Sequence, residues 1–275
     1  MKLNELVRAA IRGSQFITHL SLGVILGSAY RLRYGRHWHL TVTGQASIRW
    51  WAQHMTRIVG IRITQYGRPL SADVMHVANH ISYLDILVIS SIVPVRFLSK
   101  HTLRYWPIVG YLAQLCGTVF IQRAKSSRLS QTLDALRAAL RSGRPLLIFP
   151  EGTTSLGTEV LKFHSGLFQA AINNKVPVQT LTLHYRRDGR ADRIAAYIDK
   201  DNFLISLLRL MAQSKTEAHI HFSPPIDSTA HTRQQLAAYC QAHIRHTLNR
   251  QLQMSGAGGP FAARTELVIL GECQP

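Results

Sequence analysis

Residues 77–85 of the chain read Val-Ala-Asn-His-Ile-Ser-Tyr-Leu-Asp and mark a change from one kind of element to another. The apolar run 74–78 predicts a buried strand, and the apolar residues after Asp85 predict a helix. His80 therefore lies where a strand ends, and Asp85 lies in the first turn of the next helix. A histidine and a carboxylate so placed can act as a general base and the group that orients it. Ser82 and Asp85 fit a capping box equally well, which stabilises a helix start without any chemistry.

Strand-like and helix-like segments alternate along most of the chain from residue 60 onward. Short apolar runs predict strands at 61–65, 73–78, 95–99, 117–122, 146–149, 178–183, 193–197 and 218–222. Longer periodic runs predict helices at 82–92, 106–115, 130–142, 161–173, 203–211 and 232–251. This alternation predicts an α/β fold with a mixed β-sheet flanked by helices. The expected domains are membrane-docking helices over 1–60, an α/β domain over 61–251, and a flexible tail over 252–275 that includes a linker at 255–260.

The charge balance of the chain is unusual for a soluble domain. Charged residues make up 17% of the 275 residues and hydrophobic residues 46%, yet the formal net charge is +18. Residues 1–72 hold ten Lys or Arg and one acid, Glu5, which gives +9, half of the total excess. Few charges, mostly positive, on an apolar chain favour an anionic membrane surface as the partner. Nucleic acid is disfavoured because no zinc-finger spacing, RNP-like motif or lysine-rich tail is present.

The three cysteines are far apart and form no CxxC pair or metal-binding spacing, which indicates reduced thiols.

The first residues predict a membrane-associated helical hairpin. Residues 1–34 have a helical pattern, and the eighteen residues between Arg12 and Arg31 carry no formal charge. Polar residues interrupt this run and Gly23 and Gly27 weaken it, so we expect a helix that dips into one leaflet, with a single membrane span as the alternative. Residues 46–60 place apolar side chains on one helical face and cations on the other, which suits a membrane interface; an ordinary helix packed on the core is the alternative. The apolar helix 203–211 is a further candidate for lipid contact.

Three later clusters also lie at strand boundaries. Residues 117–123 read Gly-Thr-Val-Phe-Ile-Gln-Arg. An arginine at a strand end can bind a phosphate through two parallel hydrogen bonds, although a solvated basic loop is the simpler explanation of this cluster alone. Residues 149–155 read Phe-Pro-Glu-Gly-Thr-Thr-Ser, a buried strand that enters a turn whose amides can face an anion or a developing oxyanion. Val176 and Pro177 begin another strand, a weak signal by itself.

Taken together in this order, the four clusters resemble the conserved blocks of the glycerolipid acyltransferases. The blocks read Asn79-His80-x4-Asp85, Gly117-x2-Phe120-Ile121-x-Arg123, Phe149-Pro150-Glu151-Gly152-Thr153 and Val176-Pro177. The resemblance covers roughly residues 45 to 225, and the first and third blocks are the specific ones. One departure follows Lys100, where the family often has an acidic residue two positions on and this chain has Thr102. The best-known bacterial members are the 1-acyl-glycerol-3-phosphate acyltransferases.

The resemblance implies transfer of a fatty acyl group from acyl-CoA or acyl-carrier protein to a lipid hydroxyl. His80 would be the general base and Asp85 would hold its tautomer, with no metal ion and no cofactor required. Backbone amides near Gly152 are candidates for the oxyanion hole. The residues implied in substrate binding are Lys100, Arg123, Glu151, Gly152 and Thr153. Glu151 cannot itself favour a phosphate, so we expect it to orient a cation or a hydroxyl.

The resemblance favours lysophosphatidate as the acceptor, which would give phosphatidate in phospholipid synthesis. Another lysolipid, such as lyso-ornithine lipid, is the enzymatic alternative, and a non-catalytic basic membrane-binding protein is the alternative from another class. The implied location is the inner (cytoplasmic) membrane, with the catalytic domain on its cytoplasmic side. The acceptor, the donor and the surface would be the partners, and no nucleic acid is expected.

Overall fold

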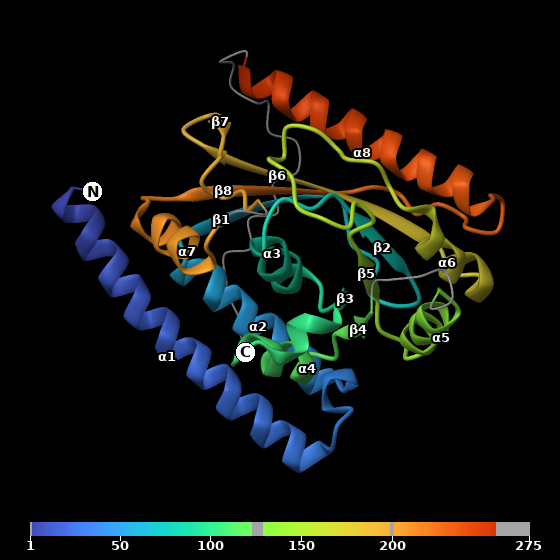
Figure 1. Cartoon of the computed structure of the whole chain (residues 1–275), viewed down its shortest axis with the longest axis horizontal. Coiled ribbons are helices and arrows are strands. Elements are labelled where there is room, and N and C mark those ends of the chain that lie inside the picture. The colour runs from blue at the N-terminus through green and yellow to red at the C-terminus, as the bar shows by residue number, and fades with distance from the viewer. Residues whose placement is uncertain (1, 123–128, 199–200, 257–275) are drawn as a thin grey trace, which may run out of the picture.

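The computed structural model of the chain describes residues 2–122, 129–198 and 201–256, and Figure 1 shows their arrangement. Its centre is a mixed sheet with the strand order β1-β8-β6-β2-β5-β3-β4, to which β7 adds at β6. The helices lie on both sides of this sheet, which confirms the predicted α/β fold. The strands are β1 (Ile61–Tyr66), β2 (Met75–Ala78), β3 (Arg96–Lys100), β4 (Val119–Ile121), β5 (Leu146–Ile148), β6 (Val178–Arg187), β7 (Arg190–Ala191) and β8 (Thr216–Phe222).

The helices form two groups on opposite sides of the sheet. In Figure 1, α8 covers one face, whereas α2, α3 and α7 cover the other, with α1 outermost. Side chains alternate between two buried clusters, because successive residues of a strand point to opposite faces. Met75 and Val77 of β2 lie in the cluster that includes α8, and Ala78 lies in the cluster that includes α3. The helices are α1 (Leu3–Tyr34), α2 (Val42–Ile58), α3 (Leu84–Ile92), α4 (Val109–Leu115), α5 (Leu129–Leu140), α6 (Gln169–Asn174), α7 (Phe203–Ala212) and α8 (Arg233–Gly256).

Four parallel strands bring their carboxyl ends to one edge of the sheet. β2 pairs in parallel with β5, β5 with β3, and β3 with β4. In open α/β sheets, ligands bind outside the carboxyl ends of such strands. β6 is also parallel to β2 but has ten residues where β2 has four, and its Leu181 pairs with Ala78 at the end of β2. The later residues of β6 therefore continue past the end of β2, beside the loop that begins with Asn79.

The apolar face of α2 is buried inside the protein, so the interface interpretation of residues 46–60 is wrong and the alternative, a helix packed on the core, is correct. Ile48 is 6% exposed, and Met55 and Val59 are each 1% exposed. Met55 and Val59 join the same core cluster as the sheet and α3. A stripe buried against α3 is not available to lipid. The division of the chain at residue 60 stays a prediction.

The N-terminal residues 3–34 form the predicted helix, α1, which is followed by a short 3-10 turn, η1 (Trp38–Leu40), and then α2. Within the described residues, no helix combines the length and the apolar character that crossing a bilayer requires.

A buried arginine ties the η1 turn to the sheet. Arg144 is 1% exposed. Its guanidinium donates hydrogen bonds to the main-chain carbonyls of Pro94, Val95, His39 and Cys116, at 2.7, 3.0, 3.1 and 3.2 Å. Burial lowers the pKa of Arg144 to about 10, which leaves the side chain charged at neutral pH. Segments before and after the first block are thus joined by one cation and four main-chain oxygens.

The helix predicted over 161–173 begins later, as a 3-10 turn, η4 (Ser165–Phe168), that leads into α6. Two long-range hydrogen bonds hold the residues before it extended. The amide of Leu161 donates to Oε2 of Glu151 at 3.1 Å, and the amide of His164 donates to the carbonyl of Pro150 at 2.9 Å. These bonds tie the segment to the turn after β5, and the helical turns begin only at Ser165.

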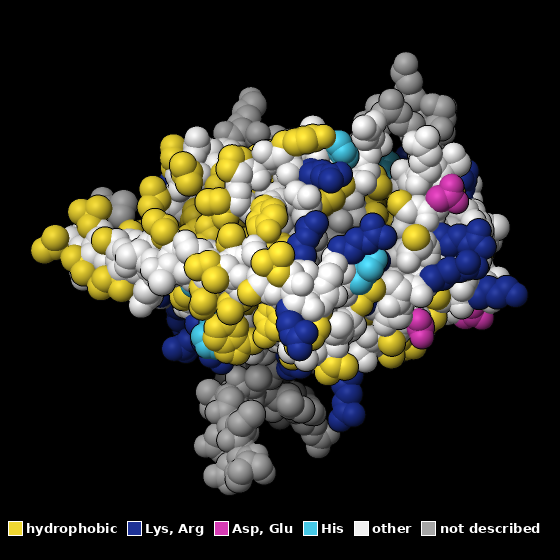
Figure 2. All heavy atoms as spheres, turned by 90° about the horizontal axis from the view of Figure 1, so that it is seen from below, with side chains coloured by type: hydrophobic (Ala, Val, Ile, Leu, Met, Phe, Trp, Pro, Cys, Tyr) yellow, Lys and Arg dark blue, Asp and Glu magenta, His cyan; other side chains and the backbone are white. Residues whose placement is uncertain are grey.

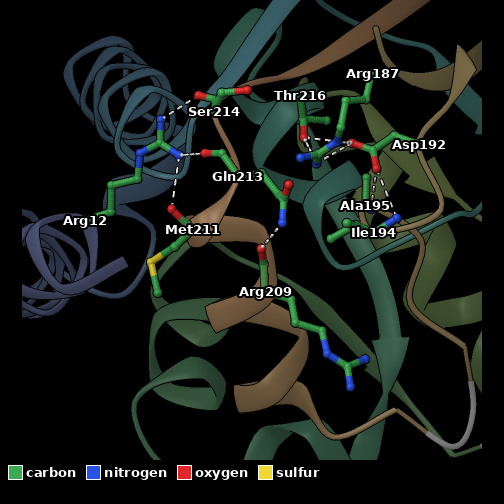
Figure 3. A network of polar contacts seen from close by, with 10 residues as sticks. All are labelled: Arg12, Arg187, Asp192, Ile194, Ala195, Arg209, Met211, Gln213, Ser214 and Thr216. Atoms are coloured by element: carbon green, nitrogen blue, oxygen red, sulfur yellow. Dashed lines mark hydrogen bonds and ion pairs between the residues drawn. The ribbon is translucent and has the colours of Figure 1, made fainter. Parts of the chain in front are cut away.

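The strand predicted over 193–197 does not form in the described structure, because Asp192 turns the chain there. Its Oδ1 accepts hydrogen bonds from the amides of Ile194 and Ala195 at 3.0 and 3.3 Å (Figure 3), and an aspartate that bonds its own following backbone stabilises a turn. The segment instead packs on the first block, where the amide of Tyr197 donates to the carbonyl of Ile81 at 3.0 Å.

Two smaller differences concern helix ends. The helix predicted from residue 106 is α4, which begins only at Val109, because Ile108 has a left-handed φ of 61° that a helix cannot contain. The linker predicted at 255–260 is partly helical, since α8 continues through Gly256; the remainder lies outside the described residues.

Candidate active site

His80 and Asp85 form a hydrogen-bonded pair at the carboxyl end of β2. The distance from His80 Nδ1 to Asp85 Oδ2 is 2.7 Å. The His80 side chain is 20% exposed, whereas the Asp85 side chain is fully buried. Because Asp85 accepts from Nδ1, the neutral imidazole has its proton on Nδ1 and its lone pair on Nε2. The pair is therefore arranged as a base with one nitrogen fixed and the other able to take a proton.

Asp85 also organises the backbone of the loop before α3. Its Oδ2 accepts hydrogen bonds from the amides of Ile81 and Ser82 at 2.8 and 3.1 Å. Tyr83 is the N-cap of α3, so the bond to Ser82 lies one residue before the start of the helix and is not a capping-box bond. The Ser82 hydroxyl is buried and makes no hydrogen bond with the described residues. The predicted capping box therefore does not form in the described structure, and Asp85 instead holds the loop before α3 together with the His80 ring.

Phe149 and the turn after β5 support His80 from the side of the third block. The rings of His80 and Phe149 stack with their centroids 3.9 Å apart. The amide of His80 donates to Oε1 of Glu151 at 2.9 Å, and the amide of Ser155 donates to the His80 carbonyl at 2.9 Å. Both main-chain polar groups of His80 are therefore held by the cluster at residues 149–155, which contains the third block.

Glu151 is a buried acceptor for two backbone amides, and no bond from its carboxylate to a cation or a hydroxyl is found within the described residues, so the expected task of orienting one stays a prediction. It is 4% exposed, and its two oxygens accept from His80 and Leu161. Burial raises the pKa of Glu151, while these two hydrogen bonds oppose the increase. The carboxylate joins the first block to the segment after the third block. This geometry assigns it a structural task at the site.

Of the other predicted substrate-binding residues, the three that the structure describes lie around the same edge of the sheet. Gly152 and Thr153 continue the turn that Glu151 begins, and Gly152 adopts a positive φ of 74° that suits glycine. The Gly152 amide donates to the Phe149 carbonyl at 3.1 Å, so this amide is not a free donor for an oxyanion. Lys100 ends β3 and is exposed. Arg123 lies outside the described residues.

Sequence reasoning missed two residues that hold the loop from the side of β6. Asn79 exchanges two hydrogen bonds with the main chain of Leu183, at 3.0 and 2.8 Å. Tyr185 donates its hydroxyl proton to Asp85 Oδ1 at 2.8 Å. Asn79 belongs to the first block, but nothing in the sequence near Leu183 indicates that its main chain binds Asn79. Tyr185 lies in a mostly apolar strand, where the pattern predicts only that a tyrosine packs in the hydrophobic core.

This geometry suits the activation of a hydroxyl group. A fixed, partly exposed imidazole beside a fully buried carboxylate can take a proton from an alcohol and later return it to a leaving group. Cys116 is not part of this arrangement, since burial raises the pKa of its thiol and its carbonyl bonds Arg144. A nucleophile supplied by a substrate is thus the chemistry that fits.

The comparisons with known proteins agree with this geometry. The model of the Acyltransferase family matches residues 58–184, which contain His80, Asp85 and Glu151. A lyso-ornithine lipid O-acyltransferase of Pseudomonas aeruginosa is 34% identical over 260 residues, which cover 94% of this chain and 98% of that protein. The chain belongs to the glycerolipid acyltransferase family. A 1-acyl-sn-glycerol-3-phosphate acyltransferase of Neisseria meningitidis is similar to this acyltransferase over a shorter part, 32% identical across 58% of this chain and 63% of that protein.

A solved structure shares the fold of this acyltransferase. The crystal structure of the 1-acyl-sn-glycerophosphate acyltransferase from Thermotoga maritima aligns with a TM-score of 0.64, across 90% of this chain and 95% of that chain. The sequence identity is 18%, so this likeness concerns the arrangement of helices and strands. The family model and the relative from Pseudomonas aeruginosa, rather than this likeness, make the chain an acyltransferase.

Proposed function

We propose that this acyltransferase moves a fatty acyl group from a thioester donor to the hydroxyl of a lysolipid, with His80 as general base. The observation that carries the proposal is the 2.7 Å bond between His80 Nδ1 and the fully buried Asp85. That bond leaves Nε2 as the basic nitrogen on the partly exposed side of the ring. Asp85 orients the imidazole and stabilises the imidazolium that forms during proton transfer.

The reaction follows from this arrangement. His80 Nε2 removes the proton of the acceptor hydroxyl while the oxygen attacks the thioester carbonyl, and a tetrahedral intermediate forms. Its collapse forms the ester, breaks the carbon–sulfur bond and expels a thiolate, which the His80 imidazolium protonates. The thiol of CoA or of acyl-carrier protein leaves, and His80 is neutral again. No covalent acyl-enzyme is needed, because the acceptor oxygen is itself the nucleophile.

For the acceptor, we propose lyso-ornithine lipid. The support is the Pseudomonas aeruginosa protein of that name, which aligns with nearly the whole of this chain. Lysophosphatidate, the acceptor favoured by the sequence motifs, is the second candidate and is supported by the Neisseria meningitidis protein, which aligns over 58% of the chain. Both acceptors present a free hydroxyl to the same base, so the difference between them lies in how the head group is held.

A purified-enzyme assay tests the activity and the acceptor together. The enzyme is offered lyso-ornithine lipid and lysophosphatidate, each with acyl-CoA and with acyl-carrier protein, and thiol release is measured. We expect acceptor-dependent release with lyso-ornithine lipid, and its loss in His80→Ala and Asp85→Ala proteins that remain folded. Preference for lysophosphatidate would overturn the acceptor proposal alone. Absence of release with either acceptor, or retained activity in both variants, would overturn the catalytic proposal and favour a non-catalytic basic protein.

We further propose that α1 and α7 place the enzyme on a membrane surface. Every exposed residue of α1 from residue 3 to residue 29 is uncharged. Val7, Ile11, Ile17 and Ile25 on this helix are each at least 50% exposed. A helix face about 40 Å long without charge is costly to hold in water and suits contact with lipid. Figure 2 shows this side of the molecule, with hydrophobic side chains over the left part and Lys and Arg gathered on the right.

Two arginines of α1, Arg8 and Arg12, point inward and bind it to the end of α7. Arg12 donates to the carbonyls of Met211, Gln213 and Ser214 at 3.2, 2.6 and 3.0 Å, as Figure 3 shows, and Arg8 donates to the carbonyl of the last residue of α7 at 2.9 Å. These carbonyls lie at the C-terminal end of α7, where a cation is favoured by the helix dipole. The cations at this end of α1 therefore hold two helices together and do not face lipid.

The outer side of α7 extends the apolar surface of α1. Leu204, Ile205 and Leu208 are 65%, 49% and 52% exposed. We expect Leu204→Glu with Leu208→Glu to reduce co-sedimentation with vesicles of anionic phospholipid by at least several fold, because charge is expensive at a lipid interface. Tyr239→Glu is the control, since Tyr239 is 51% exposed on α8, across the sheet. Equal binding by both variants would overturn the surface proposed. A position on the cytoplasmic side of the inner membrane is part of this proposal, because the thioester donors are made in the cytoplasm.

A further inference from the structure

Asp85 receives one hydrogen bond that does not come from its own loop. His80, Ile81 and Ser82 all donate to Oδ2. Oδ1 accepts from the hydroxyl of Tyr185 at 2.8 Å, the one donor to that oxygen among the described residues. Tyr185 lies on β6, a hundred residues further along the chain, and is 2% exposed. The contact exists because β6 continues past the end of β2 and passes behind the loop.

A fully buried carboxylate needs donors on both oxygens to stay ionised and in place. No lysine or arginine contacts Asp85 in the described structure, so hydrogen bonds alone compensate the loss of hydration. The three bonds to Oδ2 share one acceptor atom and leave the carboxylate free to rotate about it. The bond to Oδ1 removes that freedom and fixes the plane of the carboxylate against a rigid strand.

We propose that Tyr185 is a positioning residue for acyl transfer, which holds Asp85 in the orientation that keeps His80 Nε2 directed at the acceptor hydroxyl. This inference rests on the proposed role of His80 as general base. Tyr185 touches neither substrate nor the reacting atoms, and it acts through Asp85. The two ends of the first block are then both fixed to β6, Asn79 through the main chain of Leu183 and Asp85 through the Tyr185 hydroxyl.

The direction of the effect follows from the charges around the pair. Loss of the Tyr185 hydroxyl leaves Oδ1 of Asp85 without a hydrogen-bond donor. The negative charge of Asp85 is then less stabilised, so the His80–Asp85 pair holds a proton more strongly. Two other titratable groups are close: Glu151, whose carboxylate bonds the His80 amide, and Tyr83, whose hydroxyl lies 3.5 Å from the hydroxyl of Ser206 on α7. Burial and the neighbouring Asp85 raise the pKa of Tyr185 well above 10, so its hydroxyl remains a donor at every working pH.

The test compares Tyr185→Phe with Tyr83→Phe, which removes a hydroxyl from the same region without touching Asp85. For Tyr185→Phe we expect kcat to fall about tenfold or more, in keeping with the loss of a hydrogen bond to a charged group, and the acceptor KM to change less than about twofold. The acid limb of the pH–rate profile should move up by about half a pH unit or more. Tyr83→Phe should leave both the rate and the profile close to the wild-type values.

A second measurement needs no substrate. The titration of His80 is followed by NMR of its imidazole carbon in the wild type, Tyr185→Phe, Asp85→Asn and the double variant. We expect the Tyr185→Phe midpoint to move to higher pH in the presence of Asp85, and not to move in the Asp85→Asn background. A wild-type midpoint in Tyr185→Phe, or the same shift in both backgrounds, would overturn the inference. Inactivity of the wild-type enzyme toward both lysolipids would overturn the proposed function and leave the NMR result standing on its own.

Discussion

The replacement Glu151→Gln separates two roles that an acidic residue can have at this site. If Glu151 contacts the acceptor, the change should raise the acceptor KM. The structure instead places its two oxygens on the amides of His80 and Leu161, at 2.9 and 3.1 Å, with the side chain 4% exposed. We therefore expect the variant to lose stability and kcat, while the acceptor KM stays within about threefold of the wild-type value.

The magnitude follows from the two hydrogen bonds. A glutamine keeps one oxygen and turns an NH2 group toward the other amide, so one buried N–H is left unpaired. An unsatisfied buried donor costs about 1–3 kcal/mol. Part of this cost is offset because burial already raises the pKa of Glu151, which means that the ionised form is held at some expense. We expect the free energy of unfolding to fall by about 2 kcal/mol, which corresponds to roughly 4–8 °C in Tm for a protein of this size.

The catalytic effect depends on how far His80 moves. Its amide is one of two main-chain anchors from the third block, and a displacement of about 1 Å can cost a factor of about a hundred in rate. We expect kcat to fall by about 10- to 100-fold. Initial rates over a range of acceptor concentrations and a thermal melt measure the two effects. Glu159→Gln is the matched control, since Glu159 is exposed in the same loop and its replacement should change neither quantity. A raised acceptor KM with normal kcat and Tm would refute the positioning argument.

Two further predictions concern stability. Arg144→Met should lower the free energy of unfolding by about 3 kcal/mol or more in urea titrations, because four buried carbonyls lose their donor. Arg141 is exposed, so Arg141→Met should change this free energy by less than about 0.5 kcal/mol. An equal effect of both replacements would contradict the stabilising role of Arg144. Burial lowers the pKa of His76 to about 4. The neutral His76 side chain therefore contributes its full share to folding stability above pH 6.5, and this share is lost as the pH falls toward 4. His76→Gln, which can still donate to the Leu70 carbonyl, should therefore reduce the loss of stability between pH 7 and 5.5 by about 1 kcal/mol, and an unchanged pH dependence would exclude this role.

Local pattern was enough to recognise the first block and most of the elements. A short apolar run ending at Asn79 and His80 predicts a strand that stops at a polar loop, and the apolar run after Asp85 predicts a helix, as the structure confirms. Both patterns depend only on residues close in sequence, so the contacts that form between distant segments on folding do not change these two elements. The same pattern failed over 193–197, where the side chain of Asp192 captures the amides that a strand would have used.

The face of α2 shows a limit of another kind. An apolar stripe predicts that a helix face is buried away from water, but it does not indicate whether protein or lipid covers that face. In the folded chain α3 takes that face, with Met55 and Val59 in its core. The lipid-facing candidates are α1 and α7, whose apolar side chains remain exposed after every contact within the described protein has been made.

The sequence by itself determined that His80 and Asp85 face each other across one loop, since five positions at a strand–helix junction suffice for that contact. Only the tertiary structure decided what holds the pair. Glu151 reaches His80 across 71 positions and Tyr185 reaches Asp85 across 100, through strands that become neighbours when the sheet assembles. A hydrogen bond between such distant residues leaves no periodicity and no spacing in the sequence, because the chain between them is free to vary in length and composition. The catalytic pair could therefore be predicted from a short stretch of sequence, whereas the contacts that hold it rigidly form only when the sheet assembles.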